Sequence, residues 1–191
     1  MTPTVSSRTR IAALVIVLLA AAWTTGVWAA QAPGPSDRQL LREVQQQVLG
    51  YSHYTVFDSI SASIKDGVVT LTGKVTTSEK REDLAKRVAS VRGVRQLQNR
   101  IEVLPASRSD DELRQVIARS IYDHPTFRPY ATHVNPPIHI VVERGRVTLE
   151  GVVTDQAEKL LAASLSGGFG AFSVKNDLKT TAEARAELAK F

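Results

Sequence analysis

Apolar and polar positions alternate strictly in two short segments of the chain, residues 67–75 and 145–153. In the first segment Val69, Leu71 and Val75 share one face, and the residues between them are mostly polar. Side chains two positions apart in a strand lie on the same face, so the pattern predicts a strand with one buried and one solvated face. The second segment repeats the pattern, which indicates an internal repeat.

A glycine interrupts the apolar face of each of these strands, at Gly73 and Gly151. A glycine inside a strand leaves no side chain to pack and often marks a place where another element approaches closely. We expect a helix to cross the sheet at each glycine.

The residues around the first strand predict a unit in the order helix, strand, strand, helix, strand. A capping box of Ser36 and Gln39 begins the first helix, and Gly50 follows its end. The helix has an apolar stripe at helical spacing, formed by Leu40, Leu41, Val44 and Val48. A half-buried strand is expected over 56–64, with a tight hairpin at Gly67.

The second half of this unit begins where the spacing of apolar residues becomes helical. Thr76 and Glu79 are expected to cap a helix that ends at Gly93, with Leu84, Val88 and Val91 on its buried side. Residues 94–104 alternate again and contain Asn99. The first unit therefore spans 36–105, and residues 106–108 form a linker.

The second unit, 109–180, repeats this order. Ser109 with Glu112 is expected to cap its first helix, 73 residues after the first capping box. The spacing has grown to 78 residues at Gly151, so about five extra residues are placed in the proline-containing loop 133–137. Further on, we expect a hairpin at Gly145, a helix over 154–165, a strand over 171–178 with Asn176 matching Asn99, and a tail over 181–191.

The amino terminus predicts export. Arg8 and Arg10 precede an uncharged apolar run that begins at Ile11, and Val27-Trp28-Ala29 offers small side chains at the −3 and −1 positions of a signal-peptidase site. The expected mature chain begins at Ala30, with a linker over 30–35. The alternative is an uncleaved inner-membrane anchor, because residues 11–30 carry no charge and are long enough to span a bilayer. Either way the body of the protein is exported to the periplasm.

The composition and charge of the chain exclude several kinds of site and partner. The chain has 191 residues and no cysteine, which excludes disulfides and thiolate metal sites. Its formal charge is +5, and removal of 1–29 would leave +3, since that segment carries two arginines and no acid. This mild charge does not indicate nucleic-acid binding. Residues 37–104 hold 11 Lys and Arg against 8 acids, whereas 109–180 hold 8 against 9, so the first unit is the basic one.

The chain resembles a pair of BON domains in the order of its elements. The resemblance also rests on the Val-x-Leu-x-Gly-x-Val motif, which begins at Val69 and again at Val147, and on the segment from Gly93-Val94 through Asn99-Arg100-Ile101. The resemblance implies an α+β fold with two tandem αββαβ units, each a three-stranded mixed sheet with two helices on one face. It also implies a non-enzymatic envelope protein that binds phospholipid surfaces, in envelope maintenance or osmotic-stress protection, without a cofactor. The motif positions carried over are Gly67, Gly73, Gly93, Asn99, Gly145, Gly151 and Asn176.

No set of residues indicates catalysis. The segment from Gly67 to Gly73-Lys74 superficially resembles a phosphate-binding loop, but Val75 stands where a hydroxyl is required and the segment is a predicted strand. No pair of histidines has the i,i+4 spacing of a helical metal site with a neighbouring acid; the four are His53, His124, His133 and His139. We predict neither a catalytic nor a metal site.

One basic cluster is a candidate for function. It surrounds the end of the second helix and comprises Lys86, Arg87, Arg92, Arg95 and Arg100. These cations are predicted to bind anionic phospholipid at a membrane surface; the alternative is that they complement the helix dipole and keep the surface soluble.

Four aromatic residues could also reach a membrane interface, although a core position is expected for at least two of Phe127, Tyr130, Phe169 and Phe172. The second candidate function is a protein-interaction module whose partner belongs to an envelope or secretion complex.

Overall fold

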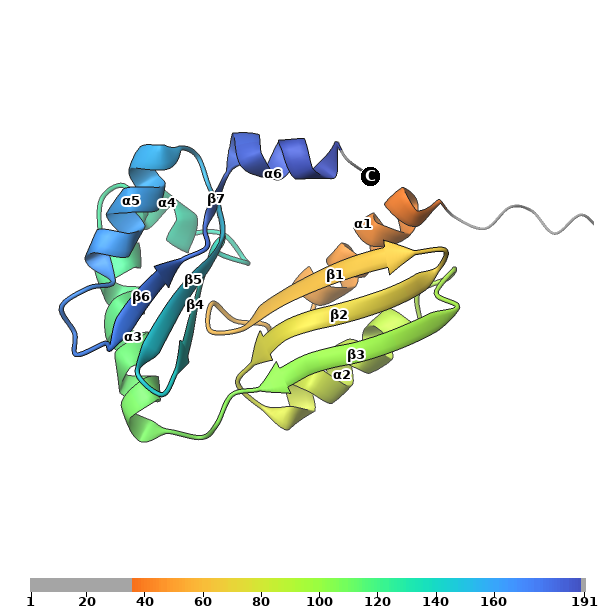
Figure 1. Ribbon diagram of the computed structural model, residues 1–191, viewed down its shortest axis with the longest axis horizontal. Coiled ribbons are helices and arrows are strands. Elements are labelled where there is room, and N and C mark those ends of the chain that lie inside the picture. The colour runs from red at the N-terminus through yellow and green to blue at the C-terminus, as the bar shows by residue number, and fades with distance from the viewer. Residues whose placement is uncertain (1–35, 190–191) are drawn as a thin grey trace, which may run out of the picture. The chain divides into compact units, whose positions relative to one another are not determined.

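The computed structural model describes residues 36–189 (Figure 1). The predicted signal peptide or anchor and the linker 30–35 lie outside these residues. Within the described part of the chain, no helix is both long enough and apolar enough to cross a bilayer.

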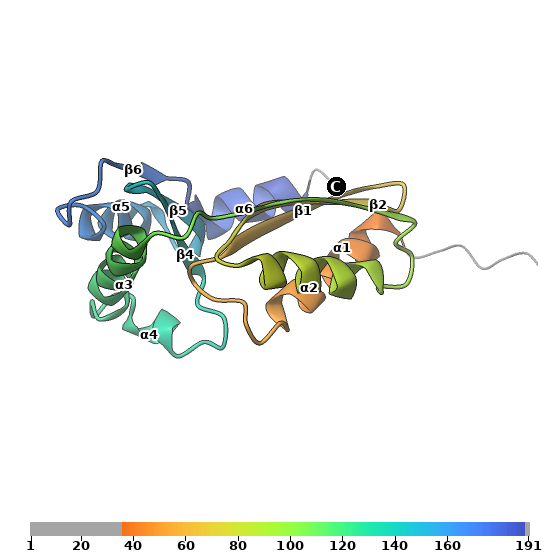
Figure 2. The ribbon, with the colours of Figure 1, turned by 90° about the horizontal axis from the view of Figure 1, so that it is seen from below.

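The first repeat contains two helices and a three-stranded sheet. Its elements are α1 (Asp37–Leu49), β1 (Ser59–Lys65), β2 (Val68–Val75), α2 (Ser78–Ala89) and β3 (Gln96–Val103). The central strand β2 pairs with β1 in antiparallel and with β3 in parallel orientation. Both helices lie on the same face of this sheet (Figure 2). The predicted mixed αββαβ unit is confirmed.

The core of the first repeat forms between the helices and the alternating face of β2. Val69, Leu71 and Val75 are fully buried, and they pack with the apolar stripes of α1 and α2 in one cluster. The predicted capping box of Ser36 and Gln39 begins α1. One-sided burial of a strand and two amphipathic helices is therefore sufficient to place the two layers, one of helices and one of strands.

The second repeat follows the same order with three additions. Its elements are α3 (Arg108–Tyr122), α4 (Arg128–Ala131), β4 (Ile138–Glu143), β5 (Arg146–Val153), α5 (Gln156–Leu165), β6 (Ser173–Asn176), β7 (Lys179–Thr180) and α6 (Thr181–Leu188). The short helix α4 precedes the proline-containing loop, and α6 occupies the predicted tail. The strand expected over 171–178 is the shorter β6, and β7 follows it; the two pair in parallel with successive parts of β5.

The expectation of a crossing helix at Gly73 and Gly151 was wrong. Both glycines have left-handed backbone, with φ of 118° and 120°. A Cβ at Gly73 would lie well under 3.0 Å from the carbonyl oxygen of Ser59, and one at Gly151 equally close to that of Pro137. The close approach is made by the backbone of the neighbouring antiparallel segment, and a side chain there would have to displace it.

Two predicted helix starts were also displaced. Thr77, not Thr76, is the N-cap of α2, because both the amide and the hydroxyl of Thr76 donate to Asp58. Ser107, not Ser109, is the N-cap of α3. The strand expected from residue 56 begins at Ser59, since the preceding residues form a turn around the same Asp58 carboxylate.

The described residues belong to one compact unit, and the two repeats contact each other within it. The amide of Ile140 in β4 donates to the carbonyl of Val56 at 2.7 Å, and Phe57 packs against the core of the second repeat. Lys74 forms an ion pair with Glu143. The turn before β1 thus completes the core of the other repeat.

Candidate functional site

A tight β-hairpin joins the first two strands of each repeat and forms one end of its sheet. An aspartate in the first turn of the first helix accepts hydrogen bonds from the amides of this hairpin. Asp66 and Gly67 have φ of 51° and 74°, which is the conformation of a two-residue hairpin turn. The Asp37 carboxylate accepts hydrogen bonds from both of their amides, at 2.8 and 3.1 Å. Asp110 does the same for the hairpin of the second repeat.

These two aspartates were missed by sequence reasoning. Asp37 and Asp110 are 73 residues apart, the same spacing as the two first helices, and each is in the first turn of its helix. That match was the available signal, but it does not reveal that the carboxylates reach across to a hairpin.

Arg92 and Arg95 gather at the hairpin end of the first repeat. The Arg95 amide donates to the carbonyl of Gly67 at 2.9 Å, and its side-chain Cγ would lie 3.0 Å from a Cβ on that glycine. The carbonyl of Gly93, next to Arg92, would lie 3.1 Å from the same Cβ. The turn between α2 and β3 therefore lies directly against the hairpin.

Two more cations belong to this end of the repeat. Lys65 immediately precedes the hairpin turn, and Arg38 follows the Asp37 that holds it. The side chains of this set are exposed, and within the described residues none forms an ion pair with a carboxylate. We call this surface the basic end; it comprises Arg38, Lys65, Arg92 and Arg95. The only acids beside it in the hairpin and helix start are Asp37 and Asp66.

The other three predicted candidates lie in different surroundings. Lys86, in the last turn of α2, is largely exposed and lies 3.8 Å from Asp83. Arg87 bridges the two helices: it donates to the carbonyls of Gln47 and Gly50 at the end of α1 and lies over the Tyr51 ring at 5.7 Å.

Arg100 lies in β3 on the face of the sheet that the helices leave open. It pairs in register with the exposed Thr72, while the adjacent Asn99 points to the carbonyl of Arg81 on α2. The predicted cluster is thus divided among the hairpin end, the helix interface and the open sheet face.

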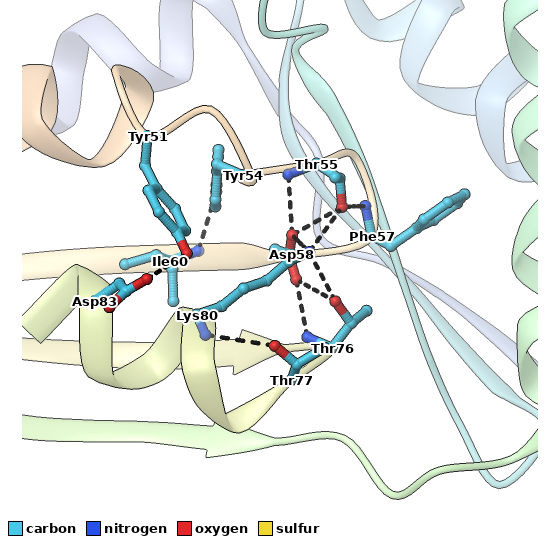
Figure 3. A network of polar contacts seen from close by, with 10 residues as sticks. All are labelled: Tyr51, Tyr54, Thr55, Phe57, Asp58, Ile60, Thr76, Thr77, Lys80 and Asp83. Atoms are coloured by element: carbon cyan, nitrogen blue, oxygen red, sulfur yellow. Dashed lines mark hydrogen bonds and ion pairs between the residues drawn. The ribbon is translucent and has the colours of Figure 1, made fainter.

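A buried carboxylate forms the densest polar network of the first repeat (Figure 3). Asp58 is fully buried and accepts hydrogen bonds from the amides and hydroxyls of Thr55 and Thr76, at 2.7 to 2.9 Å. The Lys80 ammonium donates to it at 2.6 Å. Burial alone would raise the pKa of Asp58, but these hydrogen bonds outweigh it and hold the pKa below its usual value.

This network ties three segments together, and its counterpart in the second repeat does so with different groups. There Glu158 lies in the first turn of α5, and its carboxylate accepts hydrogen bonds from the amide of Thr154 at 2.8 Å and from the hydroxyl of Tyr130 at 2.7 Å. Asp58 accepts from the amide of Thr76 and Glu158 from that of Thr154, and each of these threonines directly precedes the N-cap of the second helix of its repeat. We therefore interpret both networks as structural.

The histidines do not come together. His139 in β4 is mostly buried, and burial lowers its pKa below the usual value; its ring lies 5.3 Å from that of Tyr54. His53 lies beside the Tyr51 ring instead. Within residues 36–189, no group of three histidine or acidic side chains is arranged to hold a metal ion.

A model of the BON domain matches residues 36–105 and 109–182 of the chain. The protein belongs to the BON-domain family, with two tandem domains. The family match agrees with the two αββαβ repeats and with the glycine motifs of their central strands, so the predicted family and fold class are confirmed.

Two solved structures are similar to this chain, both of CdsD, a structural protein of the type III secretion system of Chlamydia trachomatis. The first, its C-terminal domain, is 13% identical and covers 75% of this chain and 98% of its own, with a TM-score of 0.28. The second is also 13% identical and covers 78% and 97%, with a TM-score of 0.27. Likeness at this level carries no inference about function. No curated protein matches the chain.

Proposed function

We propose that this protein is a non-enzymatic component of the bacterial envelope that binds anionic phospholipid surfaces through the basic end of its first repeat. Membership of the BON-domain family supports the envelope and phospholipid parts of this proposal. The observation that carries it is the set of exposed cations around one hairpin, none of them in an ion pair within residues 36–189.

The arrangement suits a membrane better than a single bound anion. The four cations of the basic end are spread over a helix start, a hairpin and a helix-to-strand turn, and their long side chains are exposed. Each Lys or Arg near an anionic bilayer surface contributes up to about 1 kcal/mol. Four such residues would supply up to about 4 kcal/mol, a factor of roughly a thousand in the binding constant.

The carboxylates in the same region weaken this attraction only partly. Asp37 is used in holding the hairpin amides, which leaves Asp66 as the exposed acid of the turn. Lys86 lies on the last turn of the preceding helix and adds a cation on its flank, and Arg100 adds one on the open sheet face. We include both in the proposed surface as secondary contacts.

The proposal requires no catalytic group. Lys80 and Asp58 form a nearly enclosed ion pair, and apart from the hydrogen bond between them the partners of their side chains are Thr55 and Thr76. The amino-terminal segment, as a cleaved signal peptide or as an anchor, would deliver the described residues to the periplasm.

Vesicle co-sedimentation tests the proposal. A variant with Arg38, Lys65, Arg92 and Arg95 all changed to Gln should bind anionic vesicles two to three orders of magnitude more weakly, by the estimate of about 1 kcal/mol per charge. The matched control removes four exposed cations that lie elsewhere: Arg119, Arg128, Lys179 and Arg185.

The control separates a localised site from a general effect of net charge. Equal losses in the two variants would contradict the proposed surface. Binding by the wild type that persists unchanged at high salt would also contradict it, because exposed charges are screened. Circular dichroism should show both variants folded, since exposed substitutions of this kind change stability by less than about 0.5 kcal/mol each.

A further inference from the structure

The hairpin end of the second repeat has an aromatic side chain where the first repeat has a cation. The Phe172 amide donates to the carbonyl of Gly145 at 2.8 Å, just as the Arg95 amide donates to that of Gly67. The Phe172 side chain is 84% exposed. At the same structural position the first repeat therefore has a cationic side chain and the second an exposed aromatic one.

The ring of Phe172 lies against the hairpin turn at Gly145. Its Cδ2 would be 2.6 Å from a Cβ on Gly145, so only a glycine lets the ring lie against the turn. Arg144 and Arg146 flank that glycine, and Arg146 pairs in register with Ser173, the residue after Phe172. Both arginines are exposed, and within the described residues neither forms an ion pair.

A second aromatic residue lies on the loop that leads to Phe172. Phe169 is 41% exposed and is flanked by Gly168 and Gly170, both of which have positive φ and open space around them. Phe169, Phe172 and Leu113 are among the residues that line an open groove of about 700 Å³. We call Phe169, Phe172, Arg144 and Arg146 the aromatic end.

Acids near this groove do not offset its cations. Asp110 is buried and holds the hairpin amides, Asp111 forms an ion pair with Arg114, and Glu112 pairs with Arg108 at 2.9 Å. The exposed chemistry that remains is two phenyl rings beside two cations. This combination matches the bilayer interface, where aromatic rings are favoured below a layer of anionic phosphates.

We propose that the aromatic end inserts Phe169 and Phe172 into the interfacial layer of a phospholipid bilayer, with Arg144 and Arg146 against the lipid phosphates. This inference rests on the proposed function, since it assumes that the protein reaches a membrane surface. It adds a second contact of a different kind: the basic end attracts the protein electrostatically, and the aromatic end supplies apolar burial, which salt does not screen.

The first experiment measures binding that resists salt. The full chain with Phe169→Ser and Phe172→Ser should lose about tenfold or more of its affinity for anionic vesicles at high salt, because two exposed rings are no longer buried. The matched control removes two other exposed apolar side chains, by Leu160→Ser on α5 and Leu188→Ser on α6, and should bind as the wild type does.

The second experiment observes insertion directly. The two tryptophans of the chain, Trp23 and Trp28, lie in the predicted leader, so changing both to Phe removes all intrinsic tryptophan. In that background Phe172→Trp should show a blue-shifted emission and protection from acrylamide on adding anionic vesicles. Leu160→Trp, at a position 61% exposed, should show neither change.

The outcomes distinguish the two proposals. Vesicle binding with no emission shift at position 172, or equal salt-resistant binding by the Phe→Ser variant and the wild type, overturns insertion and leaves the proposed function intact. Failure of the wild type to bind anionic vesicles at low salt overturns the proposed function, and the insertion inference with it.

Discussion

Replacing Gly73 with alanine tests the central geometry of the repeat. The added Cβ would lie well under 3.0 Å from the carbonyl oxygen of Ser59, which is backbone of the paired strand β1. Backbone cannot move aside as the end of a flexible side chain can, so β1 must separate from β2 or the strand must distort. Gly73 also has φ of 118°, which alanine adopts only with strain.

The cost can be estimated from its two parts. A left-handed conformation costs a residue with a Cβ roughly 1–2 kcal/mol, and overpacking typically adds about 1–3 kcal/mol. We expect Gly73→Ala to lower the free energy of unfolding by about 2–5 kcal/mol, a large share of the 5–15 kcal/mol typical of folded domains. Gly151→Ala should behave alike, because its Cβ would meet the carbonyl oxygen of Pro137.

Gly168 provides the matched control. Its φ is 84°, also positive, but a Cβ there would meet nothing within 4 Å. Gly168→Ala should therefore cost only the strain of about 1–2 kcal/mol. Urea unfolding followed by far-ultraviolet circular dichroism measures all three variants. Equal losses in Gly73→Ala and Gly168→Ala would refute the clash with β1 and leave only backbone strain.

Three further predictions concern the first repeat and its boundary with the second. Asp58→Ala should lower the free energy of unfolding by about 3–5 kcal/mol in urea melts, because it leaves the nearly buried Lys80 ammonium without its anion, and a loss below 1 kcal/mol would contradict the network. Arg87→Gln should cost about 1–2 kcal/mol by the same assay through its lost contacts with α1, whereas Arg92→Gln should cost less than about 0.5 kcal/mol; equal costs would contradict the structural placement of Arg87. Burial lowers the pKa of His139, so as the pH falls through about 6.5 the unfolded chain binds a proton before the folded one does, and the free energy of unfolding should decline below that pH. A His139→Phe variant should lack this decline when unfolding is measured between about pH 8 and pH 5. An identical pH profile in the variant and the wild type would contradict the role of His139.

The alternating strands and striped helices could be predicted because their burial is one-sided. Val69 and Leu71 face a core while their neighbours face water, and that difference is written in the sequence at period two. The hairpin at Gly67 was predicted for a similar local reason, since its conformation requires a glycine.

The remaining features depend on contacts between distant segments. Asp58 lies in a turn where no periodic pattern exists, and Thr76 and Lys80, two of its three partners, follow it by 18 and 22 residues. Arg87 and Arg92 are both cations near the end of α2, but Arg87 donates to the end of α1 whereas Arg92 lies next to Gly93, whose carbonyl is close to the hairpin.

The aromatic residues illustrate the same limit. Phe127 is fully buried, whereas Phe172 is 84% exposed. We expected at least two of the four aromatic residues to lie in the core. Which of them are buried depends on the packing of the whole second repeat, which the local sequence does not show.

The most direct test of the account is equilibrium binding of the wild-type chain to vesicles of anionic phospholipid and, in parallel, to vesicles of zwitterionic phospholipid at low salt. We predict clear binding to the anionic vesicles, weaker binding to the zwitterionic ones, and a loss of most of the difference as salt is raised. Absence of binding to the anionic vesicles at low salt, or equal binding to both kinds, would contradict the claim that exposed cations of the first repeat attach this protein to a membrane.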